Sequence, residues 1–176
     1  KNVVFGFLYL VITAALGPYM ALNFVDGVTD AALGKQEQVG RLQALKADGF
    51  EENLDPLAAE DIAKANTDGI LALNKLINAE QPMDMIKGGP HAHGNLEALL
   101  NIVVGIALCF IAVSVKFKQA ISWVFILGTL LHSGALYLAA VLQTEWASNL
   151  LNPIGPALIL LGLLRAGVAA AMGFKG

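Results

Sequence analysis

Four long runs of apolar residues constrain the fold of this chain more than any other feature. They cover residues 3–25, 96–115, 121–142 and 154–173. Each run is long enough to cross about 30 Å of hydrocarbon as a helix, which takes about 20 residues. A soluble helix seldom stays apolar on every side over such a length. The runs therefore predict an all-α fold, an integral membrane bundle of four transmembrane helices, the first within 1–25 and the other three within 96–176.

The segment between the first two runs, residues 26–95, is polar and acidic. It holds twelve of the fourteen acidic residues and six of the eleven basic residues, a net charge of −6, whereas the rest of the chain carries +3. With no basic patch outside the membrane, nucleic acid is not an expected partner. We expect the segment to form a helical loop on one side of the bilayer.

Basic residues in short loops predict the orientation, because they are enriched on the cytoplasmic side. Lys116 and Lys118 join the second and third runs, while Lys1 and Lys175 lie near the two ends of the sequence. The connection 143–153 contains Glu145 and no base. These positions predict a multi-pass protein, of a bacterial inner membrane, with both termini cytoplasmic and residues 26–95 outside.

Local signals divide the outer loop into two or three short amphipathic helices. Residues 34–47 are rich in helix formers. Asp55 followed by Pro56 predicts a helix start, and Thr67 followed by Asp68 predicts another. The last helix would carry an apolar face that needs a cover, either the bundle or a partner subunit; this face is made of Ile70, Leu73, Leu76 and Ile77.

Two glycine–proline pairs predict interruptions near the outer ends of the first two spans. Proline removes one hydrogen bond of the helix ladder and clashes with the preceding turn, so Gly17-Pro18 predicts a kink in the first span. Gly88-Gly89-Pro90 predicts a break just before the second span.

Polar side chains within the spans are the best functional candidates, since the bilayer makes them costly. His93, Glu97 and Asn101 are four residues apart and form one stripe on the second helix. Tyr137 lies at a similar outer depth on the third helix, so we expect it to meet His93 and Glu97 in one pocket. His132 would lie deeper, near the middle of the membrane.

These residue types indicate a haem or metal site. Neutral imidazole is the commonest metal ligand and haem iron takes an axial histidine, so His93, His132 and His91 are the candidate metal ligands. Glu97 can accept a hydrogen bond that orients a histidine. His91 precedes the helix and also fits an interfacial polar residue, and His132 also fits an interhelical hydrogen bond. A zinc or copper cluster of His91, His93 and Glu97 is a further alternative by ligand type.

Two further residues complete the predicted cofactor site. Asn101 continues the stripe of the second helix, and Arg165, about 12 Å from the inner end of the fourth, needs a partner such as an anionic cofactor group, a lipid headgroup or another subunit. No serine–histidine–acid arrangement is expected, because the spans offer no acid near His132.

Three short segments resemble the styrene oxide isomerase family. Residues 21–27 (Ala-Leu-Asn-Phe-Val-Asp-Gly) resemble the family's Trp-Met-Asn-Leu-Val-Gly-Gly, 92–94 (Ala-His-Gly) its Ala-His-Ser-Gly, and 134–138 (Gly-Ala-Leu-Tyr-Leu) its Val-Gly-Phe-Tyr-Leu. The family's members are small four-helix membrane proteins that bind haem b and isomerise epoxides to aldehydes. The resemblance implies that His93 is the axial haem ligand and Tyr137 the catalytic, substrate-positioning residue.

The chain departs from that family at two positions. The family's active-site asparagine, six residues after the histidine, is replaced by Leu99, and its acid on the third helix falls at Thr129. The long acidic loop has no counterpart there.

Three functions follow as hypotheses. The leading one is a haem b-binding membrane protein, a redox-associated subunit or a homo-oligomer, with electron transfer as its chemistry. The second is a haem-dependent epoxide isomerase. The third is a non-catalytic accessory subunit of a larger membrane complex that docks through the outer loop.

Overall fold

The computed structural model describes residues 1–52, 55–144, 146, 147, 149 and 153–173. Most of these residues are helical and one pair of two-residue strands is present, which confirms the predicted all-α class. Glu145 and Lys175, used above for the orientation, lie outside the described residues. The chain divides into two compact units, residues 1–19 with 84–176 and residues 20–83.

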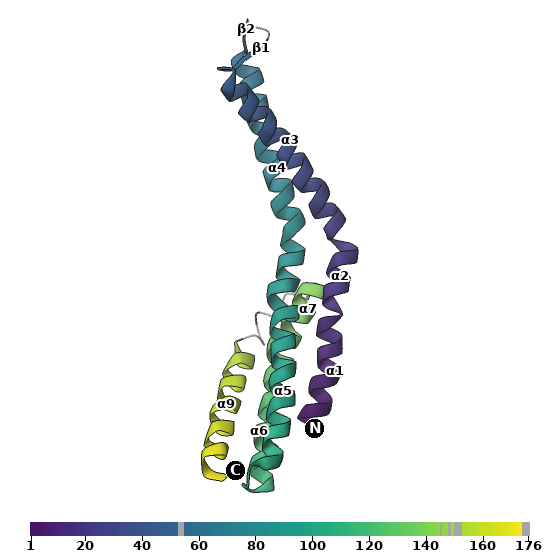
Figure 1. The fold of residues 1–176 in the computed structure, drawn as a ribbon, viewed down its shortest axis with the longest axis vertical. Coiled ribbons are helices and arrows are strands. Elements are labelled where there is room, and N and C mark those ends of the chain that lie inside the picture. Colours follow the sequence, from purple (N-terminus) through teal and green to yellow (C-terminus); the bar gives the residue numbers. More distant parts are fainter. Residues whose placement is uncertain (53–54, 145, 148, 150–152, 174–176) are drawn as a thin grey trace. The chain divides into compact units, whose positions relative to one another are not determined.

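The first unit is a helical bundle in which α1 lies beside α5, and α9 lies beside α6 (Figure 1). The fourth predicted span, 154–173, coincides with α9. The third was predicted to begin at residue 121, whereas its helix, α6, begins six residues earlier. The elements are α1 (Asn2–Ala14), η1 (Lys87–His91), α5 (Ala92–Phe110), α6 (Val115–Thr129), η2 (Leu130–Gly134), α7 (Ala135–Leu142) and α9 (Ile154–Gly173).

The two predicted interruptions are present. The first helix is broken at Ala15, after which α2 (Leu16–Asn23) begins; Pro18 has no N–H to donate to the carbonyl four residues earlier. In η1, Gly89 has φ −91° and ψ −108°, which is not helical, and Pro90 follows it. Both glycine–proline pairs therefore interrupt the helix where the sequence predicts it.

Glycines let the bundle helices approach closely. A Cβ on Gly6 of α1 would lie 2.6 Å from the Ala98 carbonyl oxygen of α5, and one on Gly128 of α6 would lie 2.8 Å from the Ile159 side chain of α9. Close approach of backbones at small residues is the usual way in which membrane helices associate, because lipid supplies no hydrophobic force between them.

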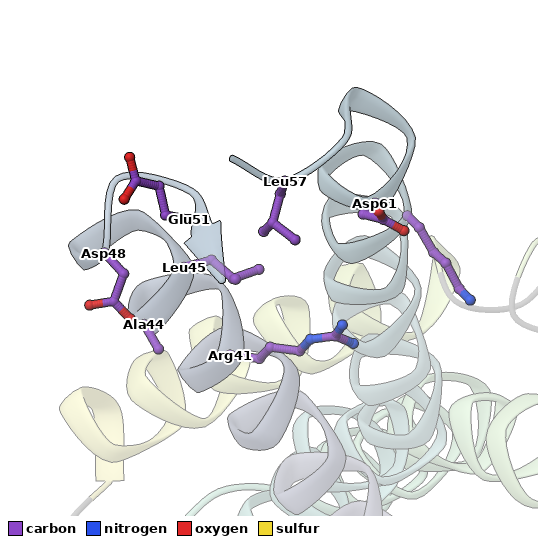
Figure 2. Close-up of a pocket in the computed structure, with 8 residues that line it drawn as sticks. Arg41, Ala44, Leu45, Asp48, Glu51, Leu57 and Asp61 are labelled. Carbon is purple, nitrogen blue, oxygen red and sulfur yellow. The ribbon is translucent and has the colours of Figure 1, made fainter. Parts of the chain in front are cut away.

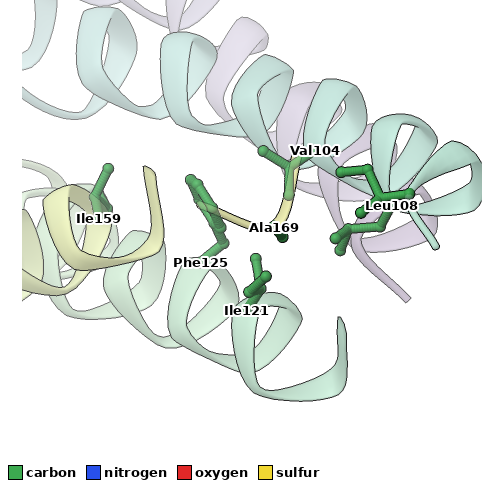
Figure 3. Packing of buried hydrophobic residues seen from close by; sticks show 7 residues of the cluster. Val104, Leu108, Ile121, Phe125, Ile159 and Ala169 are labelled. Atoms are coloured by element: carbon green, nitrogen blue, oxygen red, sulfur yellow. The ribbon is translucent and has the colours of Figure 1, made fainter. Parts of the chain in front are cut away.

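An apolar cluster joins α5, α6 and α9. Figure 3 shows Phe125 and Ile121 of α6 between the side chains of the other two helices. Phe125 and Ile121 are almost completely buried, as is Ala169 of α9. This cluster fixes α9 against the rest of the bundle.

Three basic-flank positions lie at one end of this bundle. The ammonium of Lys1 lies 5.0 Å from the centre of the Trp123 ring in α6, and the Ala112 amide, after α5, donates to the Gly173 carbonyl at the end of α9, at 2.6 Å. The start of α1, the α5–α6 connection and the end of α9 therefore share one end, as the topology prediction requires.

By length and composition, four helical segments are suited to crossing a membrane: Asn2–Asn23, Ala59–Phe110, Val115–Leu142 and Ile154–Gly173. The helix of the second span, α5, begins at Ala92 and follows η1 directly.

The second unit is a helical hairpin. It consists of α3 (Val25–Ala47), the paired strands β1 (Glu51–Glu52) and β2 (Asp55–Pro56), and α4 (Ala59–Ile86). The predicted helix starts at Asp55 and at Thr67 are both wrong. Asp55 lies in β2, and Thr67 lies inside α4, where its hydroxyl donates to the Ala63 carbonyl at 2.9 Å instead of capping a new helix.

The two helices of the hairpin meet at Gly69. A Cβ on Gly69 of α4 would lie 2.6 Å from the Leu42 side chain of α3, and Ala31 and Ala65 are buried in the unit. Leu76 is buried too, whereas three other members of the predicted apolar face, Ile70, Leu73 and Ile77, are exposed. The exposed apolar face thus lacks Leu76, one of its four predicted members.

Candidate metal centre

His93, Glu97 and His132 form a cluster between α5 and η2. One candidate ligand atom from each residue lies within 4.8 Å of the other two, and this is the group of three that the described residues provide. His93 is exposed, the His132 side chain is 13 % exposed, and Glu97 is buried. The cluster therefore runs from the surface of the bundle to its interior.

Both carboxylate oxygens of Glu97 accept hydrogen bonds. His132 Nδ1 contacts Oε1, and the Ser133 hydroxyl donates to Oε2 at 2.6 Å. Ser133 Oγ also lies 3.0 Å from the hydroxyl of Tyr9 in α1. Because Ser133 has one hydroxyl hydrogen and directs it to Glu97, Tyr9 donates to Ser133. The chain of bonds ends at a carboxylate, an acceptor-only group whose burial requires such partners.

This arrangement fixes the tautomer of His132. With Nδ1 carrying the hydrogen that points to Glu97, the lone pair is on Nε2. A carboxylate that accepts from one ring nitrogen while the other binds a metal is the usual support of a histidine ligand, and it increases the basicity of the ligand. The contact with Glu97 therefore leaves Nε2 of His132 available as a ligand atom.

A π-helical turn presents His132 and Ser133 to Glu97. The turn η2 interrupts the run from α6 to α7, and single π turns within α-helices often occur at functional sites. Gly155 at the start of α9 packs directly on the turn, since a Cβ there would lie 2.4 Å from the His132 amide nitrogen. The close contact with α9 thus holds the backbone of His132 in place.

The two imidazole rings suit neighbouring positions around one metal. Their centres are 4.8 Å apart and their planes are tilted by 57°. With a metal–nitrogen bond of about 2 Å, each ring centre lies roughly 3 Å from the metal, so rings at adjacent positions are about 4.5–5 Å apart. Rings on opposite faces of a haem iron would instead be about 6 Å apart. The observed spacing does not suit axial ligation of one haem by His93 and His132 together.

Asn101 belongs to a different polar group. Its amide nitrogen donates to the Glu97 carbonyl at 3.0 Å and to the Thr129 hydroxyl at 2.9 Å, and its oxygen accepts from Asn2 at 2.8 Å. Asn2 is bonded in turn to Ser122. The Asn101 side chain therefore links α1, α5 and α6 and is directed away from the cluster.

His91 is also separate from the cluster. Its Nδ1 lies 2.9 Å from the Thr13 carbonyl oxygen in α1, beside the break at Ala15. The Thr13 hydroxyl donates to the Asn95 side chain at 2.7 Å. His91 thus stabilises the contact of η1 with α1, in agreement with the structural alternative considered for it.

In the part of the chain that the structure describes, neither Tyr137 nor Arg165 bonds to a residue of the cluster. Among the described residues, no hydrogen bond or ring contact joins Tyr137 to His93, Glu97 or His132, and Arg165 forms no ion pair. Both side chains are half-buried. The position near Glu97 that was expected for Tyr137 is occupied by His132.

The expectation that no acid lies near His132 is wrong, because Glu97 contacts its ring. The predicted depths of Glu97, His132 and Tyr137 depend on where each helix reaches the outer surface. However, Gly89 of η1 lies beside Leu136 of α7, so the second helical path extends beyond the point taken as its end. This offset brings Glu97 level with His132 and leaves Tyr137 farther along.

Two members of the hydrogen-bonded group, Tyr9 and Ser133, were not found from the sequence. Tyr9 is 8 % exposed and Ser133 is fully buried. In the sequence each is a single polar side chain within an apolar run. Such residues are common in membrane helices that have no site, so they indicate none by themselves.

A separate hollow of about 490 Å³ lies at the tip of the hairpin (Figure 2). Arg41 of α3 extends toward α4, which carries Asp61, and Asp48 and Glu51 lie across from them. Charges of both signs line this hollow, which is typical of a solvated surface and singles out no ligand.

Comparisons of the chain with protein-family models, with curated proteins and with solved structures found no match. The functional argument therefore rests on the geometry of the cluster.

Proposed function

We propose that this chain is an integral membrane protein that binds a divalent transition metal through His93 and His132, with Glu97 holding the His132 ring. The observation that carries the proposal is the meeting of three ligand-type side chains within 4.8 Å in a bundle of helices suited to crossing a membrane. Ionisable residues inside such bundles are costly and usually serve a function.

The donor set favours zinc, iron, copper or nickel, because imidazole nitrogen suits these metals. Two protein nitrogens leave further coordination positions for water or a substrate, as in catalytic rather than structural sites. Exposure of His93 keeps one side of the site accessible.

Metal analysis of the detergent-purified protein tests the proposal. We expect about one metal ion per chain by plasma mass spectrometry, and a loss of most of it in the His93→Ala/His132→Ala double variant. His91→Ala is the matched control, because His91 is bonded to α1 and not to the cluster. A metal content that is negligible in the wild type, or equal in all three proteins, would contradict the proposal.

The second candidate is a haem b protein with a single axial histidine. It is favoured by the exposure of His93 at the surface of the cluster. Epoxide isomerisation, as in the styrene oxide isomerases, would be its enzymatic form and requires an open sixth position on the iron. Pyridine haemochrome analysis separates the candidates: bound haem lost in His93→Ala supports this one, and a metal without porphyrin supports the first.

Orientation in the membrane needs its own test. We propose cytoplasmic termini and an outer hairpin, on the basis of the basic residues at one end of the bundle. In a Cys109→Ala background, a cysteine at Glu51 should react with an impermeant thiol reagent on intact cells, whereas one at Lys116 should react only after lysis. The reverse pattern would invert the orientation.

A further inference from the structure

A pocket at the basic end of the bundle has the chemistry of a phospholipid site. It lies between α1, α5 and α6 and has a volume of about 440 Å³, within the range of about 300–1,000 Å³ that is usual for small-molecule sites. It is distinct from the metal centre, since none of the cluster residues lines it.

Its polar residues are cationic or neutral. Lys1 and Lys118 both line the pocket together with the amide of Gln119, and no acidic side chain is among the lining residues. Lys118 is half-buried, and Lys1 is held near α6 by the ring of Trp123. Two lysines and an amide that line one pocket suit a phosphate diester.

The rest of the lining is partly polar, since Asn2 and Ser122, which bond to each other, belong to it. Val3, Leu108 and Val115 come from the three helices and offer an apolar surface to an acyl chain. Basic pockets between membrane helices on the cytoplasmic side are typical binding sites for anionic lipid headgroups. A soluble phosphate would use the lysines but gain nothing from this apolar surface.

From this combination we infer that the pocket binds an anionic phospholipid, with Lys1 and Lys118 at the phosphate and the apolar surface along the acyl chain. The inference rests on the membrane part of the proposed function and is independent of the metal centre. It assigns the lipid a structural position where α1, α5 and α6 meet.

Cys109 gives a direct probe, because it lines the pocket, is exposed, and is the one cysteine of the sequence. The protein is reconstituted in nanodiscs of phosphatidylcholine alone or with phosphatidylglycerol, and the rate of alkylation by neutral N-ethylmaleimide is measured. We expect phosphatidylglycerol to slow the reaction about five- to tenfold. Lys118→Gln should remove this protection, whereas Lys116→Gln, exposed two residues earlier and outside the pocket, should retain it.

Two controls separate the site from general surface effects. A cysteine at Phe110 in a Cys109→Ala background is exposed beside the pocket without lining it and should react equally in both lipids. Soluble glycerol 3-phosphate added to phosphatidylcholine nanodiscs should give no protection.

The outcomes are distinct. Equal rates for Cys109 in both lipids, protection that survives Lys118→Gln, or protection by soluble glycerol 3-phosphate would each overturn the lipid site while leaving the metal proposal intact. Failure of the folded protein to enter any nanodisc would overturn the membrane assignment and the lipid site together.

Discussion

Replacement of Glu97 tests the proposed role of the carboxylate in the metal centre. The side chain is 3 % exposed and accepts one hydrogen bond at each oxygen, from His132 Nδ1 and from Ser133. In Glu97→Gln the amide oxygen can still accept from His132. The amide NH₂ then faces Ser133, whose hydroxyl can rotate and donate to the Thr129 carbonyl, 3.2 Å away. The substitution therefore keeps the geometry and removes the charge.

The expected magnitude follows from these contacts. A hydrogen bond to a charged group contributes about 1.5–3 kcal/mol and one between neutral groups about 0.5–1.5 kcal/mol, so Gln forfeits roughly 1–1.5 kcal/mol at His132. We expect about a tenfold weaker metal affinity, the lower end of the range for such supporting residues. Glu97→Ala removes the partner altogether, and we expect about a 100-fold loss, the upper end of the range for such supporting residues.

The assay is competition for Zn²⁺ with a chromogenic chelator in detergent, with thermal unfolding by circular dichroism to confirm that each variant is folded. Glu80→Gln, in the hairpin unit, is the control for the loss of one negative charge and should bind like the wild type. Unchanged affinity in Glu97→Ala would refute the supporting role. A loss as complete in Gln as in Ala would instead make the carboxylate a direct ligand.

Three further predictions concern the ligands and their support. His93→Ala should lower metal affinity at least 100-fold in the same competition assay, while His91→Ala should change it less than threefold. Gly155→Ala should destabilise the bundle by about 1–3 kcal/mol and weaken metal binding, because its Cβ would press on the His132 backbone; Gly167→Ala on the same helix has no atom within 4 Å and should be neutral in both measurements. Metal at 100 times its Kd should stabilise the folded protein by about 2.7 kcal/mol, seen as a higher Tm that a chelator reverses.

The helical class and the positions of the bundle helices were available from the sequence. Long apolar runs require helices, because in a bilayer each backbone amide must find its partner within the segment. The helix breaks could also be predicted, because they follow from properties of single residues. Pro18 lacks a backbone donor, and Gly89 tolerates a non-helical backbone.

In the hairpin the same local reasoning failed. The Asp55-Pro56 pair resembles a helix start, yet these residues pair with Glu51 and Glu52, and the helix begins at Ala59. The Thr67-Asp68 pair resembles another start, yet α4 runs through it. Packing of α4 along α3 outweighs a cap that is worth about 1 kcal/mol.

The sequence by itself placed His93 and Glu97 on one face of a helix, because their spacing of four residues fixes that relation. Which residue of another helix meets them was decided only by the tertiary structure. The axial offset between α5 and η2 depends on close contacts such as those of Gly6 and Gly155, and on a π turn that the residue pattern does not encode. A shift of about 7.5 Å, the rise of five helical residues, exchanges Tyr137 for His132 as the partner of Glu97.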